Sequence, residues 1–177
     1  MVVSLKGRSQ MAKKGIAAFA FGVPATIWSN RQIADTALSY AEKDGSKIFT
    51  QLDVSFGNLD QRDVERLPGE KPNAPPPTLR IARWVVKRAI EEGIGEVIVV
   101  AARPHIYRAM RDMEMAAEEA GFLQLLIKPA SEIWDWPEAK WYCKDSTQSR
   151  AQSKENWRDR EAILEMMPFD IYKHIAK

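Results

Sequence analysis

The residues best suited to chemistry lie directly after the most apolar stretch of the chain. Residues 97–101 read Val-Ile-Val-Val-Ala, and Arg103, His105 and Arg108 follow at once. An imidazole can act as a general acid, a general base or a hydrogen-bond donor, and a guanidinium group binds carboxylates and phosphates. These residue types at this spacing indicate a site for an anionic small molecule.

The same segment predicts the structure that must hold these side chains. A short run of β-branched residues without alternation is typical of a strand that is buried on both faces of a parallel sheet. Pro104 suits the first position of a helix, where its missing N–H costs nothing, so His105 is expected in the first helical turn. Because the backbone N–H groups of a first turn are free, they attract anions.

Apolar periodicity along the rest of the chain predicts alternating strands and helices. Strands are expected at 15–21, 47–54, about 96–101 and 122–127, and the second is the weakest because Gln51 and Asp53 interrupt it. Helices are expected from Ser29 or Asn30 to Gly45, from Thr78 to Gly93, from Pro104 to Gly121, and from about Ser149 onward.

This alternation predicts an α/β fold, a three-layer Rossmann-like sandwich. We expect a mostly parallel sheet of four or five strands in the order 2-1-3-4, with helices on both faces. In such a sheet the switch point lies between the carboxyl ends of strands one and three. Gly22, just after strand one, would then lie beside His105 in the crevice where open α/β proteins bind ligands.

Two of the candidate residues have a structural alternative. On a helical wheel the core stripe contains Ile106, Met110, Met113, Ala117 and Ala120. Arg108 lies almost opposite that stripe, so it is either a plain surface charge or a side chain that reaches back to an anion. His105 either bonds a loop carbonyl or serves as an acid, a base or a phosphate donor.

The composition narrows the class of protein. A formal net charge of +2 is too small to favour nucleic acid as a partner, and no run approaches the ~18 apolar residues of a membrane span. One cysteine and two histidines exclude a disulfide within the chain and a Cys/His zinc cage, so no metal site is expected, and the sequence leaves the identity of any cofactor open. Residues 13–25 resemble a short signal peptide, but removing them would delete a strand, which favours a cytoplasmic protein.

The domain organisation follows from the same patterns. Residues 1–14 are expected to form a basic flexible arm, and residues 15–177 a single α/β domain. The Pro-rich loop 57–77 shows no regular pattern, and it is either a mobile flap over the site or a passive linker. The Trp-rich segment 129–177 is expected to cap one end of the core.

Several motifs occur in an order that resembles a known family. Gly22 and Arg31 match a Gly-rich turn and an early helical Arg, and residues 105–109 match His-x-x-Arg-Ala after a strand. With residues 157–161, they resemble the YdcF/SanA-type domain, a bacterial family with a Rossmann-like fold, over most of residues 15–172. The chain departs from that family at Ala101-Ala102, where relatives carry a hydroxyl pair, and at the Pro-rich loop.

The resemblance implies a small-molecule site, because some relatives are associated with adenosyl ligands and others with the cell envelope. We predict a nucleotide-like or phosphorylated anionic ligand, bound by Gly22, Arg31, Arg103, His105 and Arg108. A hydrolase or transferase would use His105 as its acid or base, with Asp53 as a catalytic partner. The alternative is a non-catalytic interaction protein that binds a protein or nucleic acid through its Trp-rich tail or the basic helix face of Arg80, Arg83 and Lys87.

Overall fold

The sheet is the expected scaffold. A computed structural model describes residues 12–57, 63–72 and 74–176, and its five strands are parallel in the order β3-β2-β1-β4-β5. The strands are β1 (Lys13–Ala18), β2 (Lys47–Thr50), β3 (Val64–Arg66), β4 (Ile94–Val100) and β5 (Leu126–Pro129). The predicted order 2-1-3-4 corresponds to β2-β1-β4-β5, and β3 adds an edge strand.

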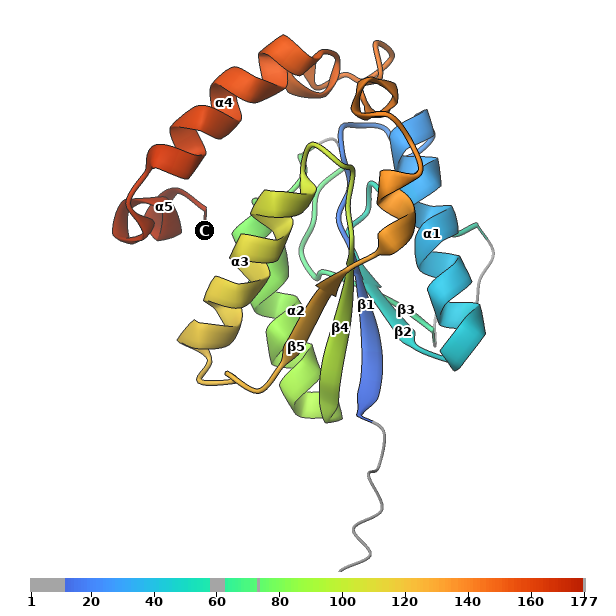
Figure 1. The fold of residues 1–177 in the computed structure, drawn as a ribbon, viewed down its shortest axis with the longest axis vertical. Coiled ribbons are helices and arrows are strands. Elements are labelled where there is room, and N and C mark those ends of the chain that lie inside the picture. The colour runs from blue at the N-terminus through green and yellow to red at the C-terminus, as the bar shows by residue number, and fades with distance from the viewer. Residues whose placement is uncertain (1–11, 58–62, 73, 177) are drawn as a thin grey trace, which may run out of the picture.

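Helices cover both faces of this sheet and make a three-layer Rossmann-like sandwich. In Figure 1, α1 lies on one side of the strands and α2 and α3 lie together on the other. The helices are α1 (Trp28–Asp44), α2 (Thr78–Glu92), α3 (Ile106–Glu119), α4 (Lys154–Met166) and α5 (Phe169–Ile175). Gly45 and Gly93 end α1 and α2 in the left-handed conformation, as the sequence predicts.

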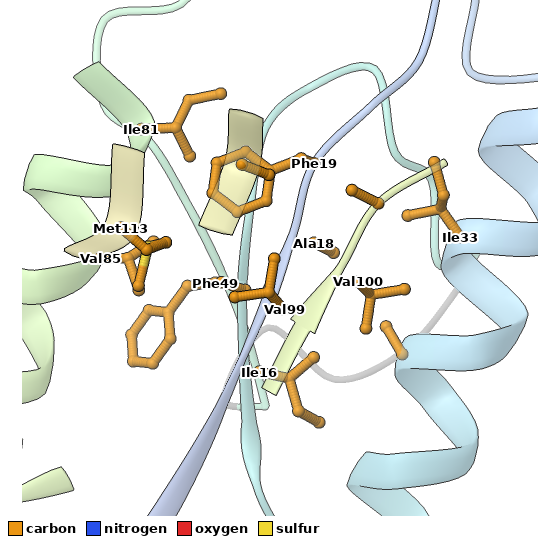
Figure 2. Packing of buried hydrophobic residues seen from close by; sticks show 14 of the residues in the cluster. Ile16, Ala18, Phe19, Ile33, Phe49, Ile81, Val85, Val99, Val100 and Met113 are labelled. Atoms are coloured by element: carbon orange, nitrogen blue, oxygen red, sulfur yellow. The ribbon is translucent and has the colours of Figure 1, made fainter. Parts of the chain in front are cut away.

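The core fills the space between the sheet and each helical layer. Successive residues of a strand point to opposite faces, and in Figure 2 Val99 lies on the side of α2 and α3 while Val100 lies on the side of α1. Val100 and Ile33 of α1 face each other, whereas Phe49, Val85 and Met113 gather on the opposite side. All five are buried, so β4 is covered on both faces as its apolar run predicts.

Several predicted boundaries were wrong. β1 begins at Lys13, so Lys13 and Lys14 belong to the sheet rather than to the predicted arm, whose residues 1–11 lie outside the described part. β2 ends at Thr50, and β5 covers Leu126–Pro129 because residues 122–125 still form the turn that follows α3. These errors fall at element ends, where sequence patterns are least informative.

The Pro-rich loop 57–77 contains regular structure that the sequence did not predict. Residues 64–66 form β3, which pairs with β2 from Ile48↔Val64 to Thr50↔Arg66. Leu67 is buried behind this strand, and the backbone N–H of Leu52 donates to Glu70 Oε2 at 2.9 Å. The prediction of an irregular loop was therefore wrong for its middle, while residues 58–62 and 73 lie outside the described chain.

The C-terminal segment passes over the carboxyl end of the sheet. Short 3-10 helices η1 (Ser131–Trp134), η2 (Glu138–Trp141) and η3 (Ser149–Ala151) lead into α4, which in Figure 1 runs above the carboxyl ends of the strands. The predicted terminal helix from Ser149 is thus η3 followed by α4 and α5. Trp157 Nε1 donates to the carbonyl of Pro104 at 2.9 Å, and Tyr172 Oη donates to Asp112 Oδ2 at 2.5 Å. Both bonds fasten the terminal helices to α3.

Candidate functional site

A cavity of about 320 Å³ lies at the carboxyl end of the sheet, which we call the arginine cavity. Its floor comes from the chain after β1 and from the starts of α2 and α3, and its other walls come from η3, α4 and α5. Three guanidinium groups line it, those of Arg108, Arg150 and Arg160. Of its lining residues that the structure describes, none is acidic. The arrangement is suited to an anion because no acidic side chain of the described lining competes for these guanidinium groups.

Gly22 lines this cavity, as the switch-point argument predicts. It has φ +89°, and a Cβ there would lie 2.7 Å from Ser146 Oγ and 2.9 Å from Ala151 Cβ. Asn30 fastens the same turn, since its amide donates to the carbonyl of Gly22 at 3.0 Å and its oxygen accepts from Phe21 N at 2.8 Å. Asn30 therefore holds the turn rather than capping α1, which begins two residues earlier at Trp28.

His105 also lines the cavity, but its ring is enclosed by aromatic side chains. Only 4% of the residue is exposed, and the rings of Phe19, Phe21 and Trp157 surround it at centroid distances of 6.2, 6.4 and 5.5 Å. This burial, reinforced by the charge of Arg108, lowers the pKa of the imidazole well below its usual value. His105 precedes α3 as its N-cap, so the prediction that it lies within the first turn was wrong by one residue.

Arg108 is buried, which corrects the prediction that it faces away from the core. It is 7% exposed, its Nε donates to Glu161 Oε2 at 2.8 Å, and its Nη1 donates to Thr78 Oγ1 at 2.6 Å. The helical wheel considered only the sheet as a packing partner, whereas α4 covers the outer side of α3. Met110 is only half-buried because the buried surface of α3 extends toward Arg108 and Asp112, and Ala120 is exposed as the residue that follows the end of α3.

Arg150 and Arg160 are cavity residues that sequence reasoning missed. Burial and the charges of Arg160 and Arg108 lower the pKa of Arg150 to about 10. Burial and Arg108 also lower the pKa of Arg160. Both guanidinium groups are thus partly desolvated and lie near other positive charges, and a bound anion would offset both effects. Arg150 lies in no motif, and Arg160 lies in the family-like segment 157–161 but was not predicted as a site residue. Only the path of the terminal segment brings both to the sheet.

Three predicted site residues do not line the arginine cavity. Arg31 is exposed on α1 and borders a separate hollow near Lys140. The guanidinium of Arg103 stacks on the ring of Trp134 at 5.4 Å, outside the cavity. Asp53 is buried beneath Gln51, whose amide lies 3.5 Å from its carboxylate, and this burial raises the pKa of Asp53. Within the described chain, no hydrogen bond joins Asp53 to His105, so the predicted acid–base pair is not assembled.

The surfaces of the alternative hypothesis are occupied in part by contacts within the chain, while Arg80 and Lys87 of the basic helix face are exposed. On the predicted basic helix face, Arg83 makes two hydrogen bonds to Glu119, at 2.7 and 2.8 Å. In the Trp-rich tail, Trp141 and Trp157 are buried and Trp136 packs on Trp28 with ring centroids 5.5 Å apart. These tryptophans form the structural cap that the sequence predicts.

Two classes of feature are not found in the described residues. No group of three or more His, Cys, Asp or Glu residues there is placed to hold a metal ion. Within the same residues, no helix combines the length and the apolar character needed to cross a bilayer.

Comparison of the chain with known protein families, with curated proteins and with solved structures found no match. The resemblance to the YdcF/SanA family therefore stays a prediction from the motifs around Gly22 and His105.

Proposed function

We propose that this protein binds a small phosphorylated molecule in the arginine cavity. The observation that carries the proposal is the convergence of Arg108, Arg150 and Arg160 on one cavity without an acidic residue among its described lining. Planar guanidinium groups match the geometry of phosphate oxygens, and charge-assisted hydrogen bonds of this type are about twice as strong as neutral ones.

The position and size of the cavity support this function. Ligands of open α/β sheets bind outside the carboxyl ends of the strands at the switch point, where Gly22 and His105 meet in this fold. A volume of about 320 Å³ is near the lower end of the ~300–1,000 Å³ typical of small-molecule pockets. A phosphorylated molecule no larger than a mononucleotide therefore fits better than a dinucleotide.

The family resemblance points in the same direction. Of the residues that carry it, Gly22, His105 and Arg108 line the cavity, whereas Arg31 does not. We propose binding rather than catalysis as the core of the function, because the buried imidazole is neutral at pH 7 and has no carboxylate partner among the described residues. His105 then acts as a hydrogen-bonding group of the pocket.

Thermal unfolding in the presence of ligands tests the proposal. Inorganic phosphate, adenosine monophosphate and phenyl phosphate serve as probes, with adenosine and phenol as uncharged counterparts. A ligand that binds only the folded state at ~100 times its Kd adds about 2.7 kcal/mol of stability. We expect the phosphates to raise Tm and the uncharged counterparts to leave it unchanged.

Matched variants distinguish phosphate binding in the arginine cavity from nonspecific attraction of phosphates to positive charge elsewhere on the protein. Arg150→Gln and Arg160→Gln should each weaken binding about tenfold or more, since a hydrogen bond to a charged group contributes ~1.5–3 kcal/mol. Arg158→Gln is the control, because Arg158 is exposed on the same helix as Arg160 and does not line the cavity. The proposal fails if no phosphate raises Tm, or if Arg158→Gln weakens binding as much as Arg160→Gln.

A further inference from the structure

The arginine cavity carries more positive charge than its surroundings neutralise. Glu161 lies behind the cavity wall, where it accepts from Arg108 Nε at 2.8 Å and lies 3.6 Å from Arg160 Nη1. It is the only carboxylate of the described residues that forms an ion pair with any of the three arginines. Three guanidinium groups therefore share one carboxylate, which leaves a local charge of about two positive units.

From this charge balance we infer that the ligand presents a phosphate monoester in its dianionic form. The inference rests on the proposed function and names its substrate class. A dianion compensates both remaining charges, whereas a carboxylate or a phosphodiester carries one negative charge and leaves one guanidinium uncompensated. That uncompensated charge would lie among like charges in a partly buried cluster, which costs free energy.

A buried imidazole lies beside these charges. Arg108 Nη1 donates to Thr78 Oγ1 at 2.6 Å, and Thr78 Oγ1 lies 3.2 Å from His105 Nε2, where either group can be the donor. Nδ1 of the same ring is buried without a hydrogen-bond partner in the described residues. In the tautomer that carries its proton on Nδ1, His105 would offer a phosphate oxygen one further neutral donor.

The remaining walls indicate the organic part of the ligand. Phe21, Ile81, Leu164 and Ile175 line the cavity together with the guanidinium groups. Ile175 is 58% exposed, so part of this apolar wall is still open to solvent. A compact apolar or aromatic group attached to the phosphate would cover it. Phenyl phosphate is therefore a suitable probe of both halves of the cavity.

Isothermal titration of phenyl phosphate and of its methyl ester, methyl phenyl phosphate, tests the inference. The two probes share the ring, but the ester keeps a single negative charge at every pH above about 2. We expect phenyl phosphate to bind at least tenfold more tightly at pH 7.5. With a second pKa of about 6, its affinity should fall about fourfold between pH 7.5 and pH 5.5 at constant salt, while that of the ester stays constant.

The ester also controls for changes in the protonation of the protein between pH 7.5 and pH 5.5, since both probes bind beside the same ionisable groups. These groups are His105 before α3 and Arg108 on it, Arg150 on η3, Arg160 and Glu161 on α4, Tyr172 on α5, and Asp112 and Asp53 behind the walls. Arg160→Gln should reduce the preference for phenyl phosphate over the ester, and Arg158→Gln should preserve it.

The outcomes distinguish this inference from the proposed function. If the ester binds as tightly as phenyl phosphate and both show the same pH dependence, the dianion inference is overturned and phosphate binding stands. If neither probe binds, the proposed function itself is overturned. If Arg158→Gln reduces the preference as strongly as Arg160→Gln, overall charge rather than the cavity sets it, and the inference fails.

Discussion

The two ends of the sheet carry similar numbers of basic side chains but differ in their acidic partners. At the amino end, Lys47 lies 3.2 Å from Glu65 and 2.7 Å from Glu92. Arg88 donates to the same two carboxylates at 3.1 and 2.7 Å, and Lys13 reaches Glu92 at 3.2 Å. Arg88 also forms an ion pair with Glu91, so the three bases of this network meet three carboxylates and their charges are balanced within the chain.

At the carboxyl end, Arg108, Arg150 and Arg160 have one carboxylate, Glu161, among the described residues. The difference is consistent with the proposed binding site. A balanced network connects secondary-structure elements and needs nothing from outside. An unbalanced cluster raises the free energy of the unliganded protein, and natural proteins retain such costs chiefly where they serve function.

The largest expected effect comes from Glu161→Gln. Glu161 and Arg108 are both nearly inaccessible to solvent, and removing one charge of a buried pair costs about 3–5 kcal/mol. At the amino end, Glu65→Gln should cost at most about 1 kcal/mol because its ion pairs are partly exposed. Urea unfolding at pH 7.5 measures both, and equal losses would contradict the distinction between the two ends.

The second largest expected effect is a loss of folding stability in mild acid, caused by His105 at the carboxyl end of the sheet. The folded pKa of His105 lies well below 6.5, so below about pH 6.5 the unfolded chain binds a proton that the folded chain does not. Stability therefore falls as the pH falls, by up to about 1.4 kcal/mol per pH unit.

His105→Gln should flatten this dependence between pH 6.5 and pH 5. The exposed His174 on α5 supplies the control, since His174→Gln should leave the slope as it is. Urea unfolding at several pH values measures the slopes. A wild-type slope that His105→Gln does not change would assign the acid sensitivity to another group.

Substitution of one arginine at each end of the sheet should change the free energy of unfolding in opposite directions. Arg150→Gln removes a charge that lies among like charges, so it should stabilise the unliganded protein by about 0.5–2 kcal/mol while it weakens phosphate binding. Arg88→Gln removes paired contacts and should destabilise the protein by less than about 1 kcal/mol. Destabilisation by Arg150→Gln would show that the cavity is not under electrostatic strain.

The contrast between local and distant positions also explains what the sequence could predict. The apolar run of β4 and the glycines that end α1 and α2 determine the backbone conformation of nearby residues. The sheet and most helices could therefore be predicted from them. Gly22 and His105 were predicted to meet because both follow strands that pair side by side. Arg150 and Arg160 could not be predicted, because the docking of η3 and α4 decides their place.

The same reason accounts for the predictions at Arg108 and at the loop. Periodicity within α3 describes how the helix packs on the sheet, but it contains no information on a second layer that covers the outer side of the helix. β3 has only three residues, too few for a recognisable alternation, and its pairing with β2 is a long-range contact. Local sequence patterns thus predict the helices and strands and how neighbouring ones pack. They do not predict which distant segment of the chain covers them.

The smallest expected effect separates the motif-based site from the observed one. Arg31 belongs to the family-like pattern but is exposed on α1 and does not line the arginine cavity. Arg31→Gln should therefore change the affinity for phenyl phosphate less than twofold, whereas Arg150→Gln should change it at least tenfold. Titration calorimetry at 0.15 M salt limits the contribution of distant charges, since the Debye length is then about 8 Å. A tenfold loss in Arg31→Gln would favour the motif-based site over the cavity.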